Sequence, residues 1–307
     1  MSVGPTGQAG AWAQTCIGRT RTAGRLDPVA RRLSDPRRVR SATAEYQQWQ
    51  ALLTNRSARS RARAFLVQGV RPITAALEHG HPLPALLVDA DARLSDWARD
   101  VLARSSAPVV EMSAPLLAGL AEADTAPELV AVARLPADRL ERIGSGRDDR
   151  CGLVLVLDRP TQPGNIGSLI RSADAFGADG VVVCGHAADP YDPAAVRAST
   201  GSLFALPVVR VNAPNEVLEW AGRQRLRMVG TDEGRPDAPA VPVADTDLSR
   251  PLAIVVGNET RGMSAAWRTA CELTVAIPMR GWASSLNAAN AGSIVLYEAD
   301  RQRRGAD

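Results

Sequence analysis

Three separate segments of the sequence place polar side chains beside glycines or other small residues, in a spacing suited to ligand binding. They are Asn165-x-Gly167-x-x-x-Arg171, Gly257-Asn258-Glu259-x-x-Gly262, and Ile277-Pro278-Met279 followed by Ser285-Leu286-Asn287. Glycine allows the backbone to approach a ligand closely, and arginine binds phosphate through paired donors. These residue types indicate a ligand-binding edge in the C-terminal half of the chain.

Apolar runs of strand length surround these segments and form the frame that must position them. Such uninterrupted runs predict strands buried on both faces of a parallel sheet. The expected strands are 152–157, 181–183, 207–211, 227–230, 252–256 and 273–277, and the expected helices include 192–199, 215–225 and 285–297. Ser284, Ser285 and Asn287 are candidates to cap the last helix. The loops after residues 230, 256 and 277 then meet at one end of the sheet, where open α/β sheets bind ligands.

The N-terminal half predicts a second, smaller unit. Residues 1–41 are rich in Gly, Ala, Thr and Arg, which predicts a basic and disordered arm. Helical and strand patterns alternate over residues 42–135, as in a small α/β domain. Residues 136–150 are polar and contain glycines, so they are expected to be a linker. Residues 151–307 would then form the larger domain.

Positive charge is concentrated near the N-terminus. Residues 1–63 contain 12 arginines and 3 acidic residues, whereas the whole chain has a net charge of +3 and no lysine. The segment 56–63 is expected to be a basic loop that contacts phosphate through Arg56, Arg59, Arg61 and Arg63. A solvated tail with a bias toward arginine is the alternative for the arm. The charge pattern favours a nucleic-acid partner.

Several other chemistries lack their usual signatures in this sequence. The 4 cysteines form no C-x-x-C pair and the 3 histidines form no H-E-x-x-H pattern, so no metal site is expected. There is no G-x-S-x-G or Walker A motif, and the loop after 152–157 lacks the glycine spacing that a nicotinamide-dependent oxidoreductase needs. No apolar run approaches the roughly 18 residues of a membrane span. Without a signal-peptide pattern, we expect a cytoplasmic protein.

The three segments, in this order and each at a strand end, resemble the SpoU (TrmH-type) family of RNA ribose 2′-O-methyltransferases, within the SPOUT superfamily. The resemblance covers about residues 151–303, and residues 42–135 are similar to the small L30e-like substrate-binding domain of that family. It implies an α/β SPOUT catalytic domain, with a parallel sheet and a C-terminal trefoil knot, preceded by an L30e-like α/β domain. It also implies a homodimer that uses S-adenosylmethionine.

The resemblance also implies functional residues by their positions in the motifs. The cofactor-binding residues would be Thr231, Gly257, Ile277, Met279, Ser285 and Leu286, and the catalytic residues would be Asn165, Arg171, Glu259, Ser285 and Asn287. In the family, the arginine at the Arg171 position is proposed to act as a general base. Because a guanidinium stays protonated in proteins, a clamp on the phosphate that also stabilises the developing oxyanion is the simpler role. The chain departs from the family after Asn287, where Ala288, Ala289 and Asn290 replace a common Val-Ser-Val.

The expected substrate is RNA. Tyr46–Leu53, Gly69–Ile73 and Ser284–Ala291 are most similar to family members that methylate a uridine of 23S rRNA, a modification that would give resistance to a ribosome-targeting antibiotic. The same enzyme class acting on tRNA remains an alternative. A non-catalytic RNA-binding protein is a second alternative, which would bind RNA without binding S-adenosylmethionine.

Overall fold

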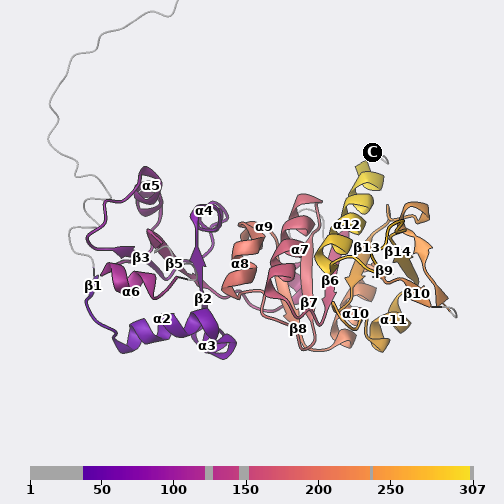
Figure 1. Cartoon of the computed structure of the whole chain (residues 1–307), viewed down its shortest axis with the longest axis horizontal. Helices are drawn as coiled ribbons and strands as arrows, with labels where there is room; N and C mark the ends of the chain where they lie inside the picture. The colour runs from indigo at the N-terminus through magenta and orange to yellow at the C-terminus, as the bar shows by residue number, and fades with distance from the viewer. Residues whose placement is uncertain (1–36, 122–126, 145–151, 236–237, 305–307) are drawn as a thin grey trace, which may run out of the picture.

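The computed structural model describes residues 37–121, 127–144, 152–235 and 238–304. Two units, each built on one large sheet, lie side by side (Figure 1). The N-terminal unit contains β1 (Arg37–Val39), α2 (Ala44–Thr54), α3 (Arg56–Ala62), β2 (Ala64–Gln68), α4 (Val70–Glu78), β3 (Ala85–Asp89), α5 (Asp96–Arg104), β4 (Val109–Met112), α6 (Ala114–Ala118) and β5 (Leu129–Arg134). Its five strands have the order β1-β4-β3-β5-β2. The β1–β4 and β4–β3 pairs are parallel, and the two pairs that involve β5 are antiparallel.

The C-terminal unit is built on seven parallel strands. Its elements are β6 (Leu153–Asp158), α7 (Pro163–Ala175), β7 (Gly180–Cys184), α8 (Pro193–Ser199), α9 (Ser202–Ala205), β8 (Val208–Val211), α10 (Pro214–Gln224), β9 (Arg227–Thr231), β10 (Gly234–Arg235), β11 (Ala238–Pro239), β12 (Val241–Pro242), β13 (Leu252–Val256), α11 (Ala265–Ala270), β14 (Leu273–Ala276) and α12 (Ala288–Arg304). The strand order is β12-β14-β9-β13-β6-β7-β8, while β10 and β11 form a separate antiparallel pair. All six strands expected from the apolar runs are present, within one or two residues of their predicted bounds, and β12 is an additional edge strand.

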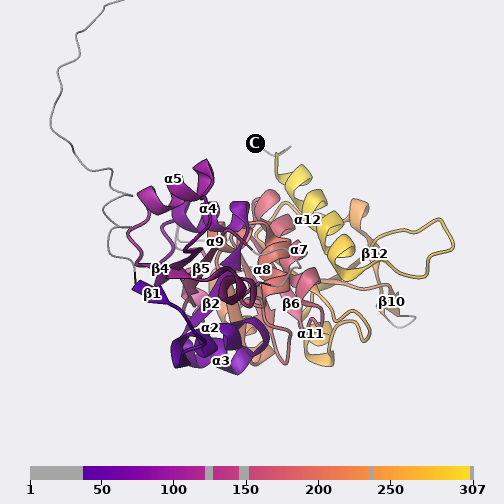
Figure 2. The same ribbon diagram turned by 60° about the vertical axis from the view of Figure 1, so that its left-hand side comes forward.

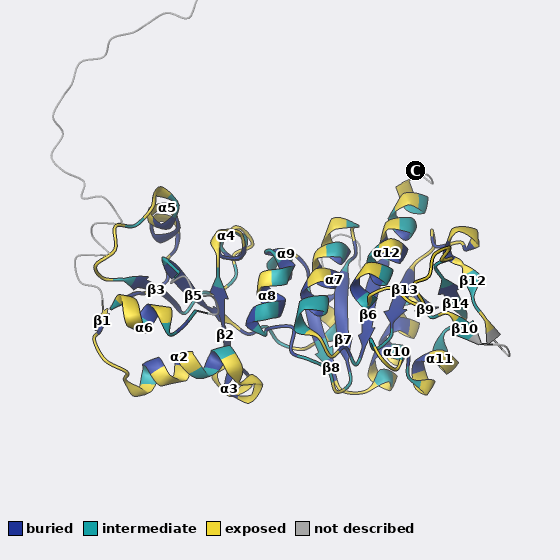
Figure 3. Cartoon of the chain, viewed as in Figure 1, coloured by how far each residue is buried: buried dark blue, intermediate teal, exposed yellow. Residues whose placement is uncertain are grey.

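Alternate residues of the central strand β6 pack against different helical layers. Leu155 and Leu157 share a buried cluster with residues of α7, α8 and α12, and Val154 and Val156 share another with Trp220 of α10. Both faces of the sheet are therefore covered. In Figure 3 the strands of this sheet are mostly dark blue, which marks buried residues, whereas the helices around them also carry exposed residues in yellow. This double covering explains why the strands read as continuous apolar runs rather than alternating ones.

The two units share one continuous core. Phe65 of β2 lies against Tyr191 and Phe204 of the C-terminal unit, with ring centroids 5.0 and 6.2 Å apart. A buried ion pair crosses the same boundary, because the Arg59 Nε lies 2.7 Å from Asp189 Oδ2. The N-terminal unit is therefore held against α8 and α9 by apolar and charged contacts.

Three predictions about the chain's organisation need correction. The disordered arm was expected to extend to residue 41, but Arg37–Val39 form a strand that pairs with β4. The rest of the arm, residues 1–36, lies outside the described residues. The expected basic loop is the helix α3, which starts because the Asn55 side chain accepts a hydrogen bond from the Ala58 N–H (3.0 Å). The first part of the expected linker includes a short 3₁₀ turn, η1 (Leu140–Arg142), and packs on the larger unit through the buried side chain of Ile143.

The last helix begins three residues later than predicted, at Ala288. This helix, α12, lies beside α7 in Figures 1 and 2. The loop 277–287 before it projects beyond the sheet, as Figure 2 shows. Gly292 makes the close approach of α12 possible, because a Cβ there would lie 2.5 Å from Leu169 Cδ2 of α7. No helix among the residues that the structure describes is long and apolar enough to span a membrane.

Candidate active site

The neighbouring strands β6 and β13 end at the point where the chain's strand order reverses direction. β6 continues to β7 on one side, while β13 pairs with β9 on the other. In open α/β sheets the loops that leave such strands form a crevice. Here the loops begin at Arg159 and Gly257, and they carry the first and second sequence motifs into contact.

The carboxylate of Glu259 joins these two loops. Its Oε2 accepts hydrogen bonds from the Thr161 N–H (3.0 Å) and hydroxyl (2.9 Å), and its Oε1 accepts one from Asn165 Nδ2 (3.1 Å). Asn165 Oδ1 in turn accepts a hydrogen bond from Asn287 Nδ2 (3.2 Å). The side chains of Glu259, Asn165 and Asn287 thus form one chain of hydrogen bonds, which links all three sequence motifs.

The hydrogen bonds around Glu259 keep it ionised. Partial burial would by itself raise its pKa, but the donors on Thr161 and Asn165 outweigh this effect, and the pKa lies below its usual value of 4.5. The pKa of Glu259 is lower in the folded protein than in the unfolded chain. The stability that ionised Glu259 contributes is therefore fully present above its unfolded-state pKa and is lost as the pH falls through its folded-state pKa.

Replacing Glu259 with glutamine should destabilise the site by about 1–3 kcal/mol, because the new amide NH₂ would face hydrogen-bond donors. We expect a slower methyl transfer at neutral pH and a smaller loss of stability upon acidification below pH 4.5 than in the wild type. Denaturant unfolding and initial rates as a function of pH measure both effects. Glu219→Gln, on an exposed position of α10, is the matched control, and equal behaviour of the two variants would contradict the role of Glu259.

The second motif is a tight turn fixed by backbone geometry. The Asn258 side chain accepts hydrogen bonds from the N–H groups of Thr260 and Arg261 (both 3.0 Å) and donates one to Arg159 O (2.7 Å). A Cβ on Gly257 would collide with the backbone of Gly262, and Gly262 itself has a φ of +63°. Glycine is therefore needed at both positions to close this turn.

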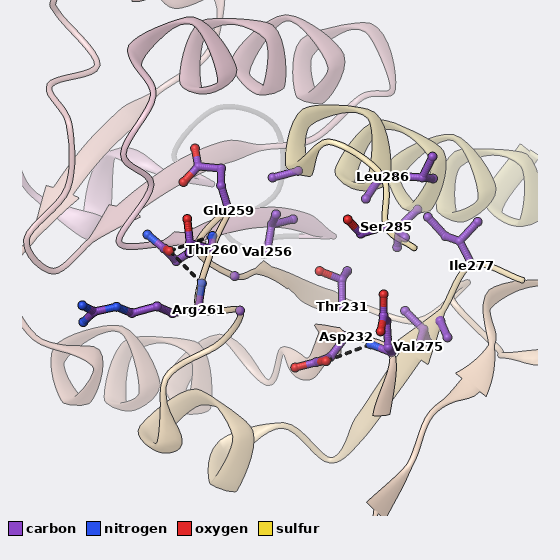
Figure 4. Close-up of a pocket in the computed structure, with 18 of the residues that line it drawn as sticks. Thr231, Asp232, Val256, Glu259, Thr260, Arg261, Val275, Ile277, Ser285 and Leu286 are labelled. Carbon is purple, nitrogen blue, oxygen red and sulfur yellow. Dashed lines mark hydrogen bonds between the residues drawn. The ribbon is translucent and has the colours of Figure 1, made fainter. Parts of the chain in front are cut away.

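A cavity of about 400 Å³ lies beside this turn, at the carboxyl ends of β9, β13 and β14 (Figure 4). It contains all six residues predicted to bind the cofactor: Thr231, Gly257, Ile277, Met279, Ser285 and Leu286. Its lining combines the apolar residues Val256, Ile277 and Leu286 with charged residues such as Asp232 and Arg261. This combination fits S-adenosylmethionine, which has an aromatic base, a sulfonium and an amino-acid tail of both charges.

A groove of about 390 Å³ lies next to the cavity, on the α7 side. Its walls are Asn165, Ser168, Arg171, Ser172, Ala175, Phe176, Ala198, Asn287, Ala289, Asn290 and Ser293. Arg171 is exposed there, and its guanidinium makes no hydrogen bond or ion pair within the described parts of the chain. A guanidinium that makes no ion pair, next to the asparagines of the groove, can bind the phosphate and ribose of a polynucleotide.

Of the predicted catalytic residues, the structure brings Asn165, Arg171 and Asn287 to this groove, with Glu259 behind Asn165. Ser285 instead faces the cavity, and its predicted role as the helix cap is wrong. The cap is Asn287, whose Oδ1 accepts hydrogen bonds from Ala289 N–H (2.8 Å) and Asn290 N–H (3.4 Å). Because α12 starts at Ala288, the cap position directly before the helix is Asn287 rather than Ser285.

The prediction that Arg59 contacts phosphate also needs correction, because its side chain is buried. Its side chain is 2% exposed, and it pairs with Asp189 and Asp192 of the other unit. The helical geometry of α3 turns it inward, whereas Arg56, Arg61 and Arg63 are exposed.

Two contributors to the site were not predicted. Thr161 gives two of the hydrogen bonds to Glu259, and its position just after a strand end was the available signal. Asp158 is buried and stabilises the loop of the second motif. Its Oδ2 accepts a hydrogen bond from the Ser264 N–H (2.6 Å), and its Oδ1 lies 2.9 Å from Arg159 Nε in an ion pair. Among the described residues there is no cluster of His, Cys, Asp and Glu that could hold a metal ion.

Comparison with known proteins identifies the family. The SpoU rRNA Methylase family matches residues 152–297, and the SpoU L30e-like domain matches residues 43–131. A 23S rRNA (uridine(2479)-2′-O)-methyltransferase of Streptomyces viridochromogenes is 52% identical, over 92% of this chain and 96% of that protein. The 23S rRNA (guanosine(2553)-2′-O)-methyltransferase RlmP of Bacillus subtilis (strain 168) is 30% identical, over 81% and 93%.

Solved structures agree with this placement. The SpoU methyltransferase AviRb from Streptomyces viridochromogenes, in complex with the cofactor AdoMet, superposes with a TM-score of 0.77 at 52% identity, over 86% of this chain and all of that one. An AdoMet-bound rRNA methyltransferase from Sinorhizobium meliloti has a TM-score of 0.75 at 28% identity, over 86% and 97%. The expected α/β fold, enzyme class and cofactor are thereby confirmed, and the chain belongs to the SpoU family of RNA methyltransferases.

Proposed function

We propose that this chain transfers a methyl group from S-adenosylmethionine to the ribose 2′-hydroxyl of a uridine in 23S rRNA. The observation that carries the proposal is the hydrogen-bonded chain Glu259–Asn165–Asn287, which connects a cofactor-sized cavity to the groove that contains Arg171. The choice of 23S rRNA and uridine rests on the relative that is 52% identical. An rRNA substrate would place the protein in the cytoplasm.

The residues of the groove have distinct proposed tasks. S-adenosylmethionine, when bound in the cavity, supplies an electrophilic methyl group on its sulfonium. Arg171 holds the phosphate next to the target ribose and stabilises the negative charge that develops on the 2′ oxygen. Asn165, whose amide is held at both ends by Glu259 and Asn287, orients the ribose so that its oxygen lies in line with the methyl group.

The test is transfer of labelled methyl from S-adenosylmethionine to protein-free 23S rRNA, with tRNA alongside, followed by mapping of the alkali-resistant linkage. We expect a single labelled uridine in 23S rRNA. Label in tRNA would keep the chemistry and discard the proposed substrate. Binding of RNA without binding of S-adenosylmethionine would overturn the proposal altogether.

The three exposed arginines of the segment 56–63 are proposed to contact RNA phosphates. Replacing Arg56, Arg61 and Arg63 with alanine should flatten the dependence of RNA affinity on salt by about 0.7–0.9 logarithmic units per lost contact. Filter binding over a series of salt concentrations measures this slope. An unchanged slope would show that these side chains do not contact RNA phosphates.

We also propose that the protein is a homodimer whose chain forms the trefoil knot. Ile294 and Tyr297 of α12 are 39% and 53% exposed, and they leave an apolar strip on the helix that returns over α7 after the long loop 277–287. Such a strip suits contact with a second copy. Analytical ultracentrifugation should give a dimer for the wild type and a monomer for Ile294→Asp; a wild-type monomer would contradict the proposal.

A further inference from the structure

A further cavity lies between the two units and is not part of the active site. It has a volume of about 380 Å³, within the range of cavities that bind small ligands. Its walls come from β2 and the start of α4 on one side and from α8 on the other: Leu66, Gln68, Gly69, Arg71, Pro72, Pro127, Pro193, Val196, Arg197 and Thr200.

The lining of this cavity suits one unstacked nucleotide. Its apolar walls include three prolines, whose rigid rings give flat surfaces for a base, and none of the lining residues is acidic. Arg71 and Arg197 stand at it, and a guanidinium both stacks on bases and binds phosphate. Proteins that bind RNA commonly hold unstacked bases in this way.

Gln68 adds a group able to read the edge of a base. Its Nε2 donates a hydrogen bond to Leu120 O (2.8 Å), which fixes the orientation of the side-chain amide. No donor to its Oε1 is found in the part of the chain that the structure describes. This oxygen is therefore available at the cavity wall to accept a hydrogen bond from a base N–H.

The cavity and the reaction groove lie on different sides of the same helix, α8. Val196, Arg197 and Thr200 line the cavity, while Ala198 lines the groove that contains Arg171. Figure 1 shows α8 between α4 and α7, which carry the two sites. A helix is about 10–12 Å across, and this distance corresponds to about three stacked nucleotides at about 3.4 Å each.

The walls of the cavity are held rigidly relative to the active site. Gly201, just after α8, packs so closely on α4 that a Cβ there would lie 2.8 Å from Ala75 Cβ. The buried pair of Arg59 with Asp189 fixes the same joint from α3. The distance between the cavity and Arg171 is therefore set by the fold.

We propose that this cavity holds a base of the substrate RNA about three nucleotides from the methylated ribose. The fixed spacing between the cavity and the reaction groove then selects which nucleotide is methylated. The inference rests on the proposed function, because it takes RNA as the substrate. The bound base stacks between Arg71 and the prolines, and Gln68 accepts a hydrogen bond from its edge.

Photo-crosslinking tests the location. RNA fragments that contain the target uridine carry one thiolated base at each flanking position in turn, and crosslinked peptides are identified by mass spectrometry. We expect one position, about three nucleotides from the target, to crosslink to peptide 64–72 or 193–200. Crosslinks from that region only to other peptides would overturn the inference.

Substitution of Arg71 tests the energetics in the full-length protein. Arg71→Ala should raise the KM for RNA about 5- to 100-fold, as loss of one stacked base does, with unchanged affinity for S-adenosylmethionine. Arg71→Lys should be intermediate, and Arg93→Ala, which is exposed on the same unit, should match the wild type. A wild-type KM for Arg71→Ala would overturn the inference while methyl transfer stands. A protein that crosslinks here but methylates no RNA would refute the proposed function alone.

Discussion

Replacing Arg171 with alanine should lower the rate of methyl transfer about 100- to 1000-fold, the usual cost of removing one preorganised donor from a developing oxyanion. The side chain is exposed in the groove and makes no contact that holds the fold within the described ranges, so the stability of the protein should change little. Single-turnover transfer to 23S rRNA measures the rate. Calorimetric titration with S-adenosylmethionine should show unchanged affinity.

A matched substitution separates this role from a general loss of positive charge. Arg223→Ala removes another exposed arginine, from α10 on the opposite face of the sheet, and it should leave the rate unchanged. Arg171→Lys should restore part of the rate, because lysine keeps the charge and loses the paired donors. Turnover by Arg171→Ala at the wild-type level would remove this residue from the mechanism.

Replacing Arg59 with methionine should destabilise the protein by about 3 kcal/mol, the lower end of the cost of breaking a buried ion pair by removing one partner. The substitution leaves Asp189, whose side chain is 3% exposed, with Arg210 at 3.6 Å as its remaining cation in the described structure. It also leaves the carbonyl oxygens of Leu52 and Leu53 without their donor. Urea unfolding, followed by tryptophan fluorescence, measures the loss.

Arg61→Met provides the control for this experiment, because Arg61 is exposed on the same helix. Its effect should remain within about 0.5 kcal/mol. The double variant Arg59→Met/Asp189→Asn should recover part of the lost stability, since it removes the uncompensated charge. A destabilisation by Arg59→Met no larger than that of Arg61→Met would show that the pair does not hold the two units together.

The basic segment shows where a local pattern was insufficient. Four arginines alternating with small residues predicted a basic loop that contacts phosphate, but most of the segment forms the helix α3, and only three of the four arginines are exposed. Arg59 differs because Asn55 caps a helix that turns its side chain toward aspartates 130 and 133 residues later in the chain. Nothing in the neighbouring sequence indicates these distant partners.

The last motif shows a smaller error of the same kind. Ser284, Ser285 and Asn287 are all good N-cap residues, and the sequence did not distinguish between them. The choice of Asn287 depends on where α12 can begin, and this is set by the packing of Gly292 against Leu169 of α7.

The strands could be read from the sequence, because a sheet covered on both faces requires uninterrupted apolar runs. The three loops could be located as well, because glycine, asparagine and arginine gather directly after strands in three separate segments. How these loops act together could not be read from the sequence. The contact of Thr161 with Glu259 joins residues 98 positions apart, and that of Asn287 with Asn165 joins residues 122 apart. Such contacts depend on the order of strands in the sheet, which arises from the packing of the whole chain rather than from any local pattern.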